Sequence, residues 1–206
     1  MLFDALAVFS FLIVLLLLKR LVNIYPSLMA SLIRSKELIN LEASVKLARD
    51  RDMLALAMVM PFCLVAFRFR LYSPGFLERF TDNQALGFYF LFFAAYLMLR
   101  LLSSWLFRPQ KMPKKTYAVG NRASYSFFIV LTLVLLAMGG VLELLKVDES
   151  VVRSAMLWVS AIIYIIFLLR KTQIFATSCS IFTAFLYLCA LEMIPTGILI
   201  VPAIIF

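Results

Sequence analysis

The chain is divided by long apolar runs that approach or exceed the length needed to cross a lipid bilayer. Hydrocarbon offers no hydrogen-bond partner to exposed backbone groups, so a run that crosses it must be helical or part of a closed barrel. Barrel strands alternate in polarity, and these runs do not. We therefore predict an all-α, polytopic membrane protein with one domain, residues 1–206, and about six transmembrane helices, at 2–18, 53–67, 85–107, 123–145, 154–169 and 174–194.

The composition agrees with this class of protein. Hydrophobic residues make up 65% of the chain, and the mean hydropathy is +1.02. Lys and Arg outnumber Asp and Glu by 20 to 11. In a soluble protein this surplus would indicate nucleic-acid binding, but here most of it lies in connections between apolar runs. Membrane topology and anionic lipids account for it there, so we expect a lipid bilayer and no nucleic acid as partner.

The distribution of basic residues predicts an orientation in the membrane. The connections after the first and third runs are the most basic, and the third, residues 108–122, has five Lys and Arg and no acidic residue. Basic connections remain in the cytoplasm, so we expect the odd-numbered connections inside and both termini outside. The first run has no basic segment before it and no small-x-small cleavage site. It is therefore expected to be a retained span rather than a cleavable signal peptide.

The first connection has the pattern of a helix rather than a loop. Between residues 27 and 50, apolar residues recur at near-helical spacing while charged residues occupy the other faces. Pro26 suits the first turn of such a helix. We predict an amphipathic helix over 27–50 at the cytoplasmic interface. It would either contact lipid directly or pack against the protein's own bundle.

Several ionisable residues fall at the ends of the predicted spans. With this topology Asp4, Glu143 and Glu192 lie near the outer ends of three spans, and Arg68 and Arg70 lie at the outer end of a fourth. Ionisable groups within membranes are rare, usually paired and often functional. One interpretation is that Glu192 forms an ion pair with Arg68 or Arg70. The other is that these side chains reach the headgroup region separately and mark helix ends.

Arg100 and Pro195 are the other candidates within apolar sequence. Arg100 lies about two turns from the cytoplasmic end of the third span, where its side chain either extends toward that surface or contacts a substrate. Pro195 removes a helical hydrogen bond, so it predicts a break or kink in the last span. The segment after it is too short to cross the membrane again.

The sequence excludes several kinds of chemistry. It contains no histidine, which excludes bis-histidine haem, HExxH zinc sites and Ser-His-Asp triads. It has no Walker-type loop and no GxGxxG motif. The three cysteines, Cys63, Cys179 and Cys189, lie in apolar runs without CxxC spacing and are expected to be small core residues. We therefore expect no catalytic residues, no metal and no cofactor.

The last third contains a basic pair, an aromatic-rich span and a Leu-Glu-x-x-Pro element, in "LLRKTQIFATSCSIFTAFLYLCALEMIPTGILI". This pattern resembles an uncharacterised bacterial family of polytopic inner-membrane proteins, a domain of unknown function. The resemblance is carried by Arg170, Lys171, Tyr187, Glu192 and Pro195. It implies a multi-pass protein of the bacterial inner membrane and a special role for Glu192 and Pro195. It implies no established activity.

Two hypotheses for the function follow from these features. The first is a non-enzymatic membrane protein that forms a subunit or scaffold of a larger cell-envelope assembly, such as a secretion or envelope-biogenesis complex. Its partners would be other membrane or envelope proteins, or further copies of the chain. The alternative is a small transporter or channel-like protein that uses Glu192 with Arg68 or Arg70. A lipid-modifying enzyme would need a polar constellation that the sequence does not contain.

Overall fold

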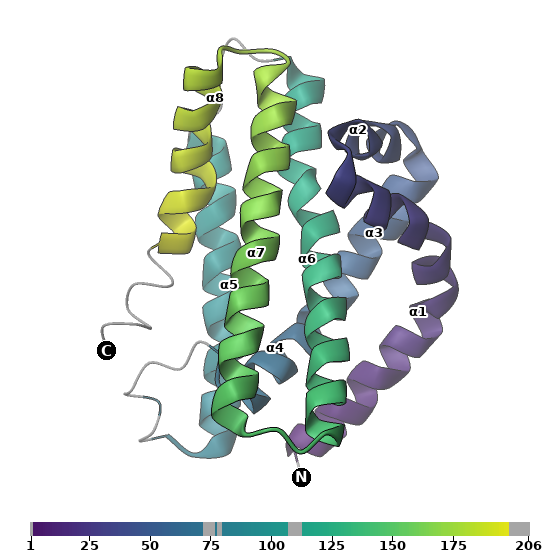
Figure 1. Ribbon diagram of the computed structural model, residues 1–206, viewed down its shortest axis with the longest axis vertical. Helices are drawn as coiled ribbons and strands as arrows, with labels where there is room; N and C mark the ends of the chain where they lie inside the picture. Colours follow the sequence, from purple (N-terminus) through teal and green to yellow (C-terminus); the bar gives the residue numbers. More distant parts are fainter. Residues whose placement is uncertain (1, 72–76, 78–79, 107–112, 198–206) are drawn as a thin grey trace.

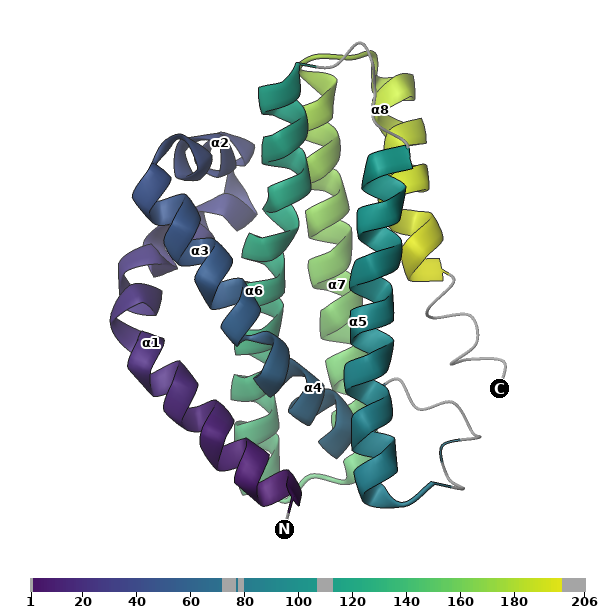
Figure 2. The ribbon, with the colours of Figure 1, turned by 180° about the vertical axis from the view of Figure 1, so that it is seen from behind.

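A computed structural model of the chain describes residues 2–71, 77, 80–106 and 113–197. The described residues form helices and no strand. Helices α5 (Asp82–Leu106), α6 (Lys114–Leu144) and α7 (Glu149–Ala176) run side by side, and α8 (Ile181–Leu188) lies beside α7 (Figure 1). On the other side of α6 lie α1 (Leu2–Ile33), α2 (Ser35–Ala43) and α3 (Val45–Ala57), and α4 (Val59–Arg68) continues from α3 to lie between α6 and α5. Figure 2 shows the same arrangement from behind.

Four helices are long and apolar enough to cross a membrane: α1, α5, α6 from Thr116 to Leu144, and α7. The all-α fold is therefore confirmed for the described residues, and four of the about six expected spans contain a helix of the length and hydropathy that a membrane crossing needs. The expected second span is divided between α3 and α4, because Met58 interrupts the helix three residues before Pro61. The expected last span corresponds to a shorter apolar helix, Ile181–Gly197, which is not among these four.

The boundary between the last two expected spans differs from the prediction. The fifth span was expected to end at residue 169, with Arg170 and Lys171 in the following connection. Instead α7 continues to Ala176, and the next helix begins at Ile181 after Ser180, whose side chain accepts a hydrogen bond from the Thr183 backbone. A serine at this position is a strong helix start signal. The basic pair therefore lies inside a helix.

The predicted amphipathic helix over 27–50 is not one continuous element. Helix α1 passes through Pro26 and ends at Ile33, and the chain is extended at Arg34 and again at Ser44. Pro26 does not begin a helix; it lies inside α1, which is visibly curved (Figure 1). The prediction failed because proline in a long helix can be tolerated with a bend. Leu38 and Leu41 of α2 are buried in the bundle, so α2 packs against the protein itself.

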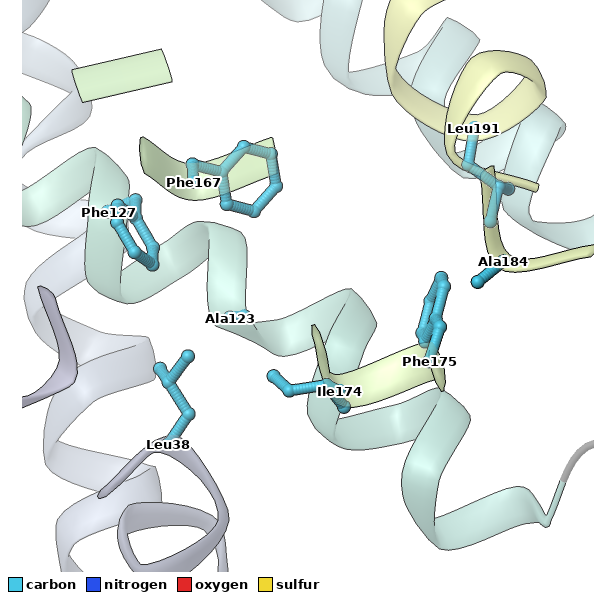
Figure 3. Close-up of a cluster of buried hydrophobic side chains, with 8 residues drawn as sticks. All are labelled: Leu38, Ala123, Phe127, Phe167, Ile174, Phe175, Ala184 and Leu191. Atoms are coloured by element: carbon cyan, nitrogen blue, oxygen red, sulfur yellow. The ribbon is translucent and has the colours of Figure 1, made fainter. Parts of the chain in front are cut away.

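One of three buried clusters joins the two halves of the molecule. It contains aromatic rings of α6 and α7 with smaller side chains from α2, α6, α7 and the last helix. Figure 3 labels its members: Leu38, Ala123, Phe127, Phe167, Ile174, Phe175, Ala184 and Leu191. The Phe127 and Phe167 rings contact each other with centroids 5.3 Å apart. This cluster holds α7 between α6 and the last helix, and so it positions the charged residues described below.

Gly120 allows the close approach of α6 to α7. A Cβ atom at this position would lie 2.2 Å from Cε1 of Phe175, whose side chain is fully buried. The adjacent pair Gly139–Gly140 lies further along the same helix. At Gly139 a Cβ would meet the tips of Phe69 and Met156 at 3.0 and 3.1 Å, and at Gly140 it would meet nothing within 4 Å. Among the glycines of the described residues, Gly120 therefore has the tightest contact.

We expect Gly120→Ala to destabilise the fold by about 1–3 kcal/mol, because the added methyl forces the Phe175 ring out of a filled site. Thermal unfolding of the purified protein in detergent measures the effect. Gly140→Ala is the matched control in the same helix. It should be neutral or slightly stabilising, because alanine favours helix and the site is open. Equal stability of the two variants would contradict the close packing at Gly120.

Candidate functional site: a buried cluster of three charges

Glu192 is the central residue of the site, and its side chain is only 1% exposed. It lies in a π-helical turn, η2 (Cys189–Met193), that follows α8 directly. Pro195 lies just after this turn and cannot donate a backbone hydrogen bond. The π-helical turn accommodates that loss, and the helix continues to Gly197. In place of the break or kink expected at Pro195, the helix has this widened turn just before the proline. Residues 198–206 lie outside the described part of the chain.

Two cations share one oxygen of this carboxylate. Nη2 of Arg100 in α5 donates to Oε1 of Glu192 at 2.8 Å, and Nζ of Lys171 in α7 donates to the same oxygen. The Lys171 side chain is completely buried and lies over the rings of Phe167 and Phe175, 5.7 and 5.5 Å from their centroids. Three elements far apart in sequence are therefore joined at a single atom.

Neutral polar groups complete the cluster. The Tyr164 hydroxyl of α7 donates to the backbone oxygen of Glu192 at 3.2 Å and lies 3.0 Å from the Thr196 hydroxyl. Arg100 Nη2 also lies 3.4 Å from the backbone oxygen of Asn121 in α6. The cluster therefore contacts α5, α6, α7 and the last helix. Such a site can fix the relative positions of four helices, and it can also hold a charged ligand.

The structure does not bring Glu192 to Arg68 or Arg70. Arg68 lies in the last turn of α4, which is near the bottom of the bundle in Figure 1, whereas the last helix lies in the upper half. Its Nη2 is 3.0 Å from Oε1 of Glu143. Both side chains of that pair are more than half exposed, so the pair adds little stability. The expectation failed because it placed Glu192 near the outer end of its span. Because α7 is longer and α8 starts later than expected, Glu192 lies closer to the start of its helix and farther from the expected outer end of the span.

Arg100 is brought into the cluster, whereas Lys171 was not among the predicted site residues. Arg100 does not extend to the surface; its side chain is 12% exposed and faces Glu192. Lys171 was missed because a basic pair after an apolar run usually marks the end of a span. A signal was present: Tyr164, Phe167, Lys171 and Phe175 recur every three or four residues, as on one helix face. The helix could have been extended through the pair on that spacing.

A second ionic network lies on the other side of α6. Arg51 of α3 is 1% exposed and donates to Glu42 of α2 at 2.8 Å and to Asp52 at 2.6 Å. Glu42 also accepts from Arg122 of α6. The Arg51 guanidinium lies 5.9 Å from the centre of the Tyr125 ring. The two cations and the two carboxylates of this network balance in charge. Its role is therefore structural: it holds α2 and α3 against α6.

The opposite end of the molecule has two surface hollows. One, of about 780 Å³, is lined in part by Asp4, Arg70 and Glu149, and the other, of about 420 Å³, by Glu143 and Lys146 among others. Arg68 and Glu149 line both, and Glu192 lines neither. The expectation that Asp4, Glu143, Arg68 and Arg70 share one end of the bundle agrees with this arrangement.

Two basic residues at this end adopt a backbone conformation that glycine prefers. Arg70 has φ of 46° and Lys146 has φ of 52°. Each follows a helix whose end is closed by a pair of hydrogen bonds; for α6 these run from Lys146 N to Glu143 O and from Val147 N to Leu142 O. This is the Schellman pattern, in which glycine is the usual residue at the left-handed position.

We expect Lys146→Gly to stabilise the protein by about 1 kcal/mol, because glycine adopts this φ without a Cβ penalty. Thermal unfolding in detergent checks the change. Lys146→Ala is the control, since it removes the same charge and keeps the strained backbone. If both variants were stabilised equally, the effect would belong to the charge and not to the backbone.

Comparison of the chain with protein-family models, with curated proteins and with solved structures finds no match. Within the described residues there is also no group of three Cys, Asp or Glu side chains placed to hold a metal ion.

Proposed function

We propose that the protein is a non-enzymatic, multi-pass membrane protein that acts as a subunit or scaffold of a larger cell-envelope assembly. Its buried charges support a structural role, because both ionic networks join helices to one another. The observation that carries the proposal is the exposure of α1: only 6% of its most apolar 18-residue window is buried inside the molecule. This surface, with Phe11, Leu16 and Val22 exposed, suits another transmembrane helix.

The proposal includes six membrane passages in a bacterial inner membrane, with both termini outside. The alternating directions of α1, the α3–α4 pair, α5, α6, α7 and the last helix support this count (Figures 1 and 2). The basic connection between α5 and α6 supports its orientation. In a background without native cysteines, Lys115→Cys should be protected from an impermeant thiol reagent in intact cells, and Ser150→Cys should react. If Lys115→Cys reacted and Ser150→Cys were protected, the orientation of the protein in the membrane would be the opposite of the one proposed.

Purification from native membranes in mild detergent tests the subunit role. We expect stoichiometric partner proteins to elute with the chain. A photo-crosslinking residue at Leu16 of α1 should join it to one of them, and the same residue at Trp158 of α7 should not. Both positions are apolar and largely exposed, 79% and 70%, so the comparison is matched. Elution of the chain without partners, with no protein adduct at Leu16, would contradict the proposal.

A small transporter or channel-like protein is the second candidate. The observation in its favour is Glu192 itself, a buried carboxylate in a π-helical turn, shared by cations from two other helices. Such turns and intramembrane charges often occur at functional sites. In the transporter proposal, the partners of Glu192 are then Arg100 and Lys171 in place of Arg68 and Arg70. Ion flux into proteoliposomes that contain the chain alone, abolished by Glu192→Gln, would favour this function over the scaffold.

A further inference from the structure

The charges of the Glu192 cluster do not balance. Arg100 and Lys171 carry two positive charges, and Glu192 carries one negative charge. Among the described residues, no other carboxylate forms an ion pair with either cation, and Glu42 is paired with Arg51 and Arg122 in the separate network. Burial of a charge without a partner is costly. One positive charge is therefore uncompensated in the interior.

The cluster also has unused hydrogen-bond donors. Both cations donate to the same oxygen, Oε1 of Glu192. Nε of Arg100 is buried and has no hydrogen-bond partner in the described part of the chain. The Lys171 ammonium has three N–H groups, and its only acceptor among the described residues is that oxygen. Buried donors are rarely left without an acceptor, so these groups indicate a further acceptor at the site.

We propose that this cluster is a binding site for a small inorganic anion, such as chloride, held by Arg100 and Lys171 beside the Glu192 carboxylate. A monovalent anion supplies the missing negative charge and accepts the unused N–H bonds. Lys171 lies five residues before the end of α7, about 7.5 Å along the helix axis, so the path from water is short. The inference goes beyond the scaffold role, because it concerns what the cluster binds and not what the protein assembles with.

A series of variants that changes the charge of the cluster tests the site. The full chain is purified in detergent, and its melting temperature is measured as chloride replaces gluconate at constant ionic strength. For the natural protein, of cluster charge +1, we expect a saturable rise of about 3–8 °C. Lys171→Met leaves a neutral Arg100–Glu192 pair and should lose the chloride dependence. Glu192→Gln leaves two cations, so it should depend on chloride more strongly than the natural protein.

Two further measurements separate this site from general salt effects and from misfolding. Arg68→Gln removes a half-exposed arginine at the opposite end and should keep the full chloride dependence. Equilibrium dialysis of the natural protein with radiolabelled chloride should give one bound ion per chain, and this result needs no variant to fold. Absence of bound chloride, or the same chloride dependence in Lys171→Met as in the natural protein, would overturn the proposal. Such a result would mean that the cluster balances its charge without an anion.

Discussion

Replacement of Glu192 by glutamine should lower the free energy of unfolding by about 3–5 kcal/mol, one of the two largest effects expected for a single substitution in this chain. The change leaves Arg100 and Lys171 buried without the carboxylate that they share. Loss of one partner from a buried ion pair is strongly destabilising, because the remaining charge stays in a medium of low polarity. Unfolding by SDS in mixed micelles, or thermal unfolding in detergent, measures the loss.

Two comparisons make this result specific. Glu143→Gln changes an exposed acid at the other end of the bundle and should alter stability by less than about 0.5 kcal/mol. The triple variant Arg100→Met, Lys171→Met, Glu192→Leu replaces the whole cluster by apolar side chains and should recover most of the stability, as buried ion pairs often can be replaced in this way. If Glu192→Gln were as stable as the natural protein, the buried cluster would not exist as described.

Replacement of Arg51 by methionine should cost about 3 kcal/mol. Its guanidinium is buried and donates to both Glu42 and Asp52, so the change leaves Glu42 with Arg122 as its one ion-pair partner among the described residues. Arg51→Lys should recover only part of the loss, because an ammonium group cannot make the same forked contacts. The same unfolding measurements apply.

Arg49→Met is the control for Arg51. Arg49 is exposed on the same helix and forms no ion pair among the described residues, so its loss should change stability by less than about 0.5 kcal/mol. Equal effects at the two positions would mean that the change in total charge, and not the buried network, determines stability.

The sequence predicted the class of fold because lipid solvation leaves few alternatives: runs as apolar as α1 and α6 must be helical where they cross a bilayer. Helix boundaries were harder to predict. Lys171 was assigned to a connection because a charge normally ends a span, and only tertiary contact with Glu192 and two phenylalanine rings makes its burial tolerable. Pro26 favours a helix start by local preference alone, and that preference does not reveal that α1 continues through it with a bend.

The candidate site was predicted in part. Glu192 and Arg100 were identified as ionisable residues in apolar sequence, and the structure brings them together. The pairing of Glu192 with Arg68 was not found, because depth along a span depends on where each helix begins. A shift of a few residues at the α7–α8 boundary moves a side chain by more than one turn. Sequence periodicity gives the face of a helix more reliably than its height in the membrane.

The shared oxygen of Glu192 imposes an order on the synthesis of the protein. Arg100 precedes Glu192 by 92 residues and Lys171 precedes it by 21, so the ribosome delivers both cations before the acid that joins them. Until the last helix is inserted, the two basic side chains have to remain near water or near the headgroups of the lipid. Final closure of the α5–α7 region therefore waits for the C-terminal part of the chain.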